Sequence, residues 1–110
     1  MVNGKRKGAA GERELAKKLN EYGYSTRRTV QYNGKADDGK ADLVGLLGIH
    51  IECKRVEKLN LYDAIAQAVH EAKGGELPTV FHRKNDCEWL VSMRLSDWMA
   101  LYKEYEEAEK

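Results

Sequence analysis

The chain has few of the residues on which several common classes of protein depend. Its 110 residues include two cysteines, one proline and one phenylalanine. Cys53 and Cys87 match no zinc-binding spacing and make a poor disulfide framework. No apolar run approaches the length of a membrane span, and the basic, glycine-rich start lacks the apolar segment of a secretory signal. We therefore expect a cytoplasmic protein with no membrane partner.

Charge is nearly balanced overall but is distributed unevenly along the chain. The formal net charge is +1, yet residues 1–40 carry ten Lys or Arg against five acids, and residues 97–110 carry two against five. A basic first part favours a phosphate-binding face, because the local field matters more than the total charge. Ordinary solvated charge would give the same composition. We expect one domain over residues 1–110, with residues 1–7 as a flexible basic start.

Hydrophobic spacing predicts an α/β fold. Leu15, Leu19 and Tyr22 recur at helical spacing, and Asn60 with Asp63 resembles the capped start of a second helix. The predicted order is helix, three strands, helix, two strands and helix, which indicates a mixed central sheet of about five strands flanked by helices. The corresponding residues are 8–22 (helix), 24–32 (strand), 41–54 (two strands), 60–73 (helix), 77–83 and 87–94 (strands) and from about 96 (helix).

The last predicted helix has an aromatic stripe. Leu95, Trp98, Tyr102 and Tyr105 recur at helical spacing. Such a stripe is more often part of a core than of a ligand site, so we expect these side chains to be buried. The same residues, with Trp89, are also candidates for an interface between two copies of the chain.

Residues 41–54, ADLVGLLGIHIECK, predict a β-hairpin. Gly48 suits the left-handed position of a three-residue loop over 46–48. The register then pairs Leu43 with Ile51 and places Asp42 opposite Glu52. Side chains alternate along a strand, so Ile51 faces the core while Glu52 and Lys54 share the other face.

Asp42 and Glu52 are therefore candidates for a metal site. Two like charges opposite each other in a ladder are destabilising, and a lysine nearby offsets them only in part. Magnesium and manganese prefer carboxylate and water oxygens and leave positions for phosphate. The alternative is a solvated polar face with an incidental Glu–Lys pair.

Glu12 is a third acid to consider. In the first helix it lies close to Leu15 and Ala16, on the side of the inward stripe. It can serve the metal cluster, as a ligand to a second ion or through water. It can equally be a favourable charge near the helix amino terminus, a role that Glu14 would fill as well.

These motifs resemble a known group of enzymes. The segments GEREL at the start of a helix, GY followed by an Arg pair, ADLVG and IECK are similar to those of the PD-(D/E)XK nuclease superfamily. Within it they resemble the Holliday junction resolvases of archaeal type and their phage-borne relatives. The resemblance implies a restriction-endonuclease-like fold of order αβββαββα and hydrolysis of phosphodiester bonds.

The resemblance also implies a role for each matching residue. Glu12 corresponds to the acid of the first helix, Asp42 to the metal-binding aspartate, Glu52 to the second metal ligand and Lys54 to the catalytic lysine. The main-chain carbonyl of Cys53 completes the ligand set. The implied cofactor is Mg²⁺, with Mn²⁺ as a substitute.

Two features leave alternatives open. The loop QYNGKADDGK lacks the serine that the resolvases usually have there, so other DNA structures are alternative substrates. Asp37 and Asp38 in this loop compete with Asp42 for the aspartate role; we prefer Asp42 because it enters the strand opposite Glu52.

We expect a metal-dependent, structure-selective DNA endonuclease that acts on branched or junction DNA as a homodimer. Alternatives are a nickase or a repair or replication nuclease of the same superfamily, or a non-catalytic DNA-binding module. The enzyme would be cytoplasmic or nucleoid-associated, and phage-encoded if it follows the phage relatives. DNA contacts, mainly to phosphates, are expected from the positive residues and from one glutamine that resembles a family residue: Lys5, Arg6, Lys7, Arg27, Arg28, Lys35, Lys40, Gln67, His82, Arg83 and Lys84.

Overall fold

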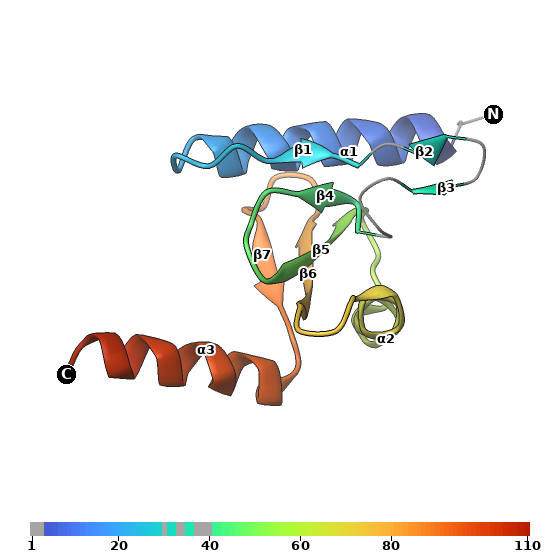
Figure 1. Cartoon of the computed structure of the whole chain (residues 1–110). Coiled ribbons are helices and arrows are strands. Elements are labelled where there is room, and N and C mark those ends of the chain that lie inside the picture. The colour runs from blue at the N-terminus through green and yellow to red at the C-terminus, as the bar shows by residue number, and fades with distance from the viewer. Residues whose placement is uncertain (1–3, 30, 33–34, 37–40) are drawn as a thin grey trace.

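The fold is a mixed β-sheet with one helix on each face and a third helix that extends away from it (Figure 1). The computed structural model describes residues 4–29, 31–32, 35–36 and 41–110. The elements are α1 (Gly4–Asn20), β1 (Arg27–Arg28), β2 (Gln31–Tyr32), β3 (Lys35–Ala36), β4 (Leu43–Val44), β5 (Ile49–Arg55), α2 (Leu61–Glu71), β6 (Leu77–Arg83), β7 (Leu90–Ser92) and α3 (Leu95–Ala108).

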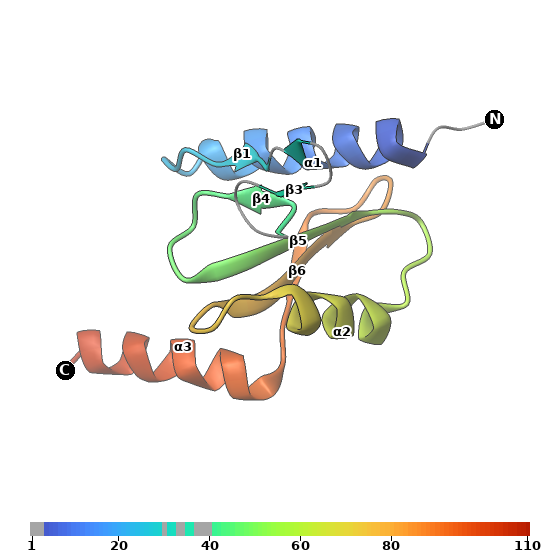
Figure 2. The same ribbon diagram turned by 45° about the vertical axis from the view of Figure 1, so that its right-hand side comes forward.

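The main sheet has five strands in the order β1-β4-β5-β6-β7, which confirms the predicted mixed sheet. β5 and β6 are parallel, and the other pairs are antiparallel. Parallel neighbours need a crossover, and α2 provides it between β5 and β6. Figure 2 shows α1 and α2 on opposite sides of β5 and β6.

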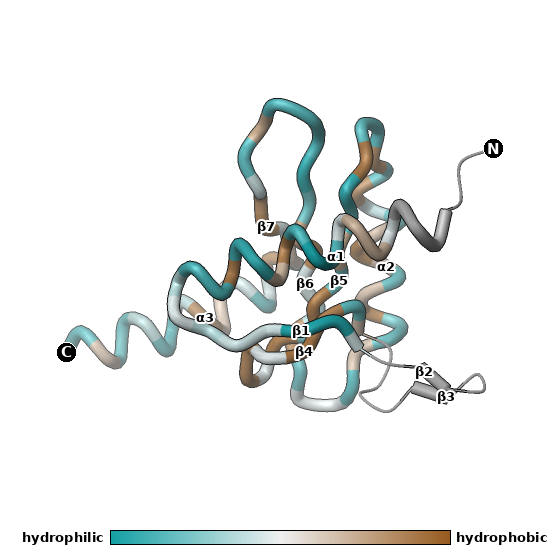
Figure 3. Tube along the Cα trace, turned by 90° about the horizontal axis from the view of Figure 1, so that it is seen from above, coloured by the Kyte–Doolittle hydropathy of each residue, from teal (hydrophilic) through white to brown (hydrophobic). Residues whose placement is uncertain are grey.

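The face under α1 holds the larger apolar core. Leu15, Leu43, Ile51 and Phe81 are buried together. A methyl group on Gly11 would lie 2.5 Å from Cβ of Arg55, so glycine lets the helix backbone approach β5. Hydrophobic segments of the chain gather along these central strands (Figure 3).

The face under α2 is covered by small residues. Ala64 and Ala68 pack against Val80 of β6. The predicted cap is confirmed, because Asn60 Oδ1 accepts a hydrogen bond of 3.1 Å from the backbone N–H of Asp63. Glu52 is the ladder neighbour of Val80 and so points to this face.

The predicted hairpin is confirmed in its register and turn. Leu43 pairs with Ile51, and Gly48 has a φ of +79°. The structure also decides between the two readings of the environment of Glu52. The alternative of a solvated polar face is excluded at Glu52, which is only 1% exposed because α2 covers it.

Three element predictions need correction. The strand predicted over 24–32 is divided into β1 and β2, and the expected polar loop contains β3, which pairs with β2 as a separate two-stranded sheet. Helix α1 begins at Gly4 and not at residue 8, so Lys5, Arg6 and Lys7 are helical residues. No residue in this stretch stops the helix, since Gly8 lowers helix propensity without ending it.

The prediction that the last helix is buried is also wrong. Trp98 is 49% exposed and Tyr105 is 61% exposed, while Asp97 is the buried residue of α3. Helical spacing identifies an apolar stripe but cannot say what covers it. Among the described residues no helix has the length and hydropathy needed to span a bilayer.

Candidate active site

The acidic residues predicted from sequence meet in an open cleft of about 390 Å³ between α1, β5 and α2. Residues from separate parts of the chain contribute to its wall. The lining residues are Gly8, Glu12, Asp42, Glu52, Cys53, Lys54, Arg55, Val56 and Gln67. All four predicted catalytic residues are therefore brought together.

Backbone pairing holds Asp42 beside Glu52. The backbone N–H of Asp42 donates to the carbonyl of Ile51 at 2.9 Å, and the backbone N–H of Cys53 donates to Asp42 Oδ2 at 2.8 Å. The side chains of Asp42 and Glu52 also interact directly. The β4–β5 ladder thus fixes two carboxylates at one point, as the hairpin register predicts.

The electrostatics of this pair show the effect of burial. Burial, followed by the charge of Glu52, raises the pKa of Asp42 from 3.8 to about 7, against the hydrogen bond from Cys53. Burial and the Asp42 charge also raise the pKa of the Cys53 thiol to about 12, which keeps it neutral. The buried Glu52 carboxylate and the half-buried Asp42 carboxylate at an open cleft fit a hard divalent cation, because its charge would offset their repulsion.

Glu12 from α1 and Lys54 from β5 complete the cleft. The Glu12 carboxylate accepts a hydrogen bond of 2.8 Å from Arg28 and contributes to the raised pKa of Asp42. Lys54 Nζ donates to Gln67 Oε1 at 3.0 Å. Gln67, which we expected to contact DNA, therefore fixes the position of the lysine ammonium.

Two neighbours of Glu52 in the structure were not predicted from the sequence. His50 Nε2 lies 3.1 Å from Glu52 Oε1, and both side chains are 1% exposed. Glu71, at the end of α2, brings a third donor to the same place. The alternation of His50 and Glu52 on β5 could have indicated a shared face, but no local pattern pairs either residue with Glu71.

The expected DNA-contacting residues lie in several environments. Arg27 and Lys84 are exposed, whereas Arg83 donates to Glu14 at 2.7 Å and His82 lies 2.8 Å from Ser92 Oγ. Burial lowers the pKa of His82, which favours its neutral form. The side chains of the other predicted DNA-contacting residues, and of the two aspartates considered in place of Asp42, lie outside what the structure describes. These residues are Lys5, Arg6, Lys7, Lys35, Asp37, Asp38 and Lys40.

A mixed five-stranded sheet that brings an acid of the first helix, an aspartate and an E-x-K strand into one cleft defines a PD-(D/E)XK nuclease. The comparison with family models agrees with this class. The chain belongs to the family described as phage putative PDDEXK endonuclease, whose model matches residues 3–110. Nucleases of this kind depend on a divalent metal ion.

A solved structure supports the fold and the resemblance stated from the motifs. The chain is similar to Hjc, a Holliday junction resolvase from the archaeal hyperthermophile Archaeoglobus fulgidus. The sequences are 26% identical, the match covers 79% of this chain and 72% of the other, and the TM-score is 0.59. A search of curated proteins gave no significant match.

Proposed function

We propose that the protein is a magnesium-dependent endodeoxyribonuclease that cuts Holliday junctions. The observation that carries the proposal is the Asp42–Glu52 carboxylate pair with Lys54 in the same open cleft. The similarity to an archaeal junction resolvase supports the choice of substrate. The family description fits a phage-encoded enzyme that acts in the host cytoplasm.

Different residues of the chain would bind the metal and stabilise charge during phosphodiester hydrolysis. Asp42, Glu52 and the main-chain carbonyl of Cys53 would hold Mg²⁺ or Mn²⁺, and Glu12 would serve a second ion or act through water. The bound metal supplies a lowered water pKa and charge neutralisation on the phosphate. Lys54 Nζ, fixed by Gln67, donates to a phosphoryl oxygen as negative charge develops there.

Substrate binding would rest on cations around the cleft. Arg28 is one described example of the predicted set, since its guanidinium contacts Glu12 in the cleft wall. Phosphate contacts by such residues give binding that weakens with salt and ignores base sequence. Together with Gln67, the proposed set comprises Lys5, Arg6, Lys7, Arg27, Arg28, Lys35, Lys40, His82, Arg83 and Lys84.

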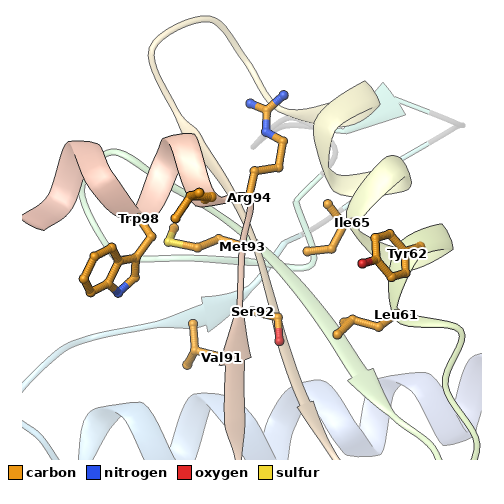
Figure 4. A pocket seen from close by; sticks show the side chains of 9 residues that line it. Leu61, Tyr62, Ile65, Val91, Ser92, Met93, Arg94 and Trp98 are labelled. Atoms are coloured by element: carbon orange, nitrogen blue, oxygen red, sulfur yellow. The ribbon is translucent and has the colours of Figure 1, made fainter.

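Two symmetric cuts in a four-way junction need two active sites, and a twofold dimer would supply both. The surface that suits this role is the apolar groove between α2, β7 and the start of α3, which Figure 4 shows with Tyr62, Ile65, Val91 and Trp98 around it. β7 is also an edge strand of the sheet. Exposed apolar patches of this kind mark protein interaction sites.

The test is incubation of the purified protein with Mg²⁺ and a synthetic four-way junction, beside linear duplex and flap DNA. Paired symmetric nicks in the junction support a resolvase. Cutting of flaps or duplex alone would identify another nuclease of the superfamily, and binding without cleavage would identify a non-catalytic module. Glu52→Gln is expected to bind the junction and not to cut it, with Glu104→Gln on α3 as the charge control.

A further inference from the structure

Three metal-binding side chains converge next to the proposed catalytic cleft. His50 and Glu52 lie two residues apart on β5 and share a face, and Glu71 ends the helix that covers it. One donor atom from each lies within 4.8 Å of the other two. Because His50 and Glu52 are almost fully buried, this donor set is held in place by the fold.

A carboxylate lies near the second nitrogen of His50, though not within hydrogen-bond distance. Glu76 Oε1 lies 4.0 Å from His50 Nδ1. Histidines that bind metals commonly donate their other N–H to a carboxylate, which fixes the ring and raises its basicity. His50 Nε2 lies 3.1 Å from Glu52, on the side where the ion would bind, and Glu76 would become the acceptor for Nδ1–H after a small closure of the 4.0 Å gap.

We propose that His50, Glu52 and Glu71 form a Zn²⁺ site that overlaps the magnesium site at Glu52. Imidazole with carboxylates suits zinc, whereas magnesium prefers oxygen ligands alone. Three protein ligands with one open position is a common zinc arrangement.

Glu52 belongs to both donor sets, so zinc and the catalytic ion compete for one carboxylate. Zinc then inhibits magnesium-dependent cleavage. This consequence rests on the proposed nuclease function, whereas the zinc site itself does not.

Zinc binding is tested directly on the untagged full chain by titration against a chromogenic zinc chelator, with thermal unfolding followed in parallel. The parent is expected to bind one Zn²⁺ and to gain thermal stability. His50→Gln and Glu71→Gln are expected to lower zinc affinity by about 100-fold. His70→Gln, an exposed histidine on the same helix, and Glu104→Gln are the matched controls and are expected to bind like the parent.

Asp42→Asn separates the two sites, because it removes a magnesium ligand and leaves the zinc ligands intact. It is expected to keep zinc binding. If zinc binding is lost in Asp42→Asn and kept in Glu71→Gln, the zinc occupies the magnesium cleft and the proposal is overturned. Should His50→Gln fail to fold, Glu71→Gln at the helix end carries the same test.

Absence of zinc binding by the folded parent would also overturn the proposal. Junction cleavage with magnesium in that case would leave the nuclease function standing. The reverse result, zinc bound and no cleavage of any DNA, would refute the nuclease function and support the zinc site.

Discussion

The carboxylate pair in the cleft makes a measurable prediction about stability without any metal. Burial and Glu52 raise the pKa of Asp42 from 3.8 to about 7 in the folded chain. A raised folded-state pKa gives stability that is present below the unfolded value and is lost as the pH rises towards 7. The ionisation of Asp42 is therefore expected to make the metal-free parent less stable at pH 8 than at pH 4.

Asp42→Asn removes this penalty and keeps an oxygen that accepts the hydrogen bond from Cys53. At about 1.4 kcal/mol per pKa unit, the rise corresponds to about 4 kcal/mol. Asp42 is only partly buried, so we take half of this, about 2 kcal/mol. For a domain of this size, about 2 kcal/mol raises the melting temperature by about 8 °C.

The assay is thermal unfolding by circular dichroism at pH 4 to 8 in EDTA. Asp42→Asn is expected to be more stable than the parent at pH 8 and to lose this advantage at pH 4. Glu104→Gln, an exposed charge change on α3, is the control and is expected to behave like the parent. Equal stability of Asp42→Asn and parent at pH 8 would refute the reasoning from buried like charges. Added Mg²⁺ is expected to stabilise the parent at pH 8 and not the variant.

Three further predictions concern other parts of the molecule. Lys54→Ala is expected to reduce junction cleavage about 100-fold with junction binding retained, because the role proposed for the lysine is to stabilise developing charge. Single-turnover kinetics and gel shifts measure the two effects, and equal losses of both would contradict the assignment. Glu14→Gln is expected to destabilise the fold by about 1 kcal/mol at pH 7 and by less at pH 3. Partial burial raises the pKa of Glu14, but the two arginines that bind the carboxylate outweigh it and lower the pKa overall. Urea unfolding at both pH values measures the loss of stability, and a loss independent of pH would count against the ion pairs. Trp98→Glu is expected to convert the proposed dimer to a monomer that keeps its fold, since the side chain is half exposed. Sedimentation velocity measures this, and an unchanged dimer would remove α3 from the interface.

The register of the β4–β5 hairpin was predictable because it depends on short-range information. A turn with Gly48 and strict alternation of side chains allow one pairing that buries Leu43 and Ile51. The same pairing sets Asp42 beside Glu52. The acid pair of the candidate site thus followed from local rules.

Other features could not be predicted because they depend on packing between distant segments. Arg83 is a basic residue of a late strand, and its sequence neighbourhood gives no sign that Glu14 of α1 binds it. The stripe on α3 has the same periodicity whether its own domain or a second chain covers it. Burial was expected, and Trp98 and Tyr105 proved to be exposed.

The sequence by itself determined the three helices, the central strands, the hairpin register and the family motifs, because each depends on residues within a turn or a strand of one another. Only the tertiary structure decided that α2 buries Glu52 and brings Glu71 to His50. The physical reason is that the crossover from β5 to β6 lays α2 across the sheet face, and the docking of that helix is set by side-chain packing along its whole length rather than by any local pattern.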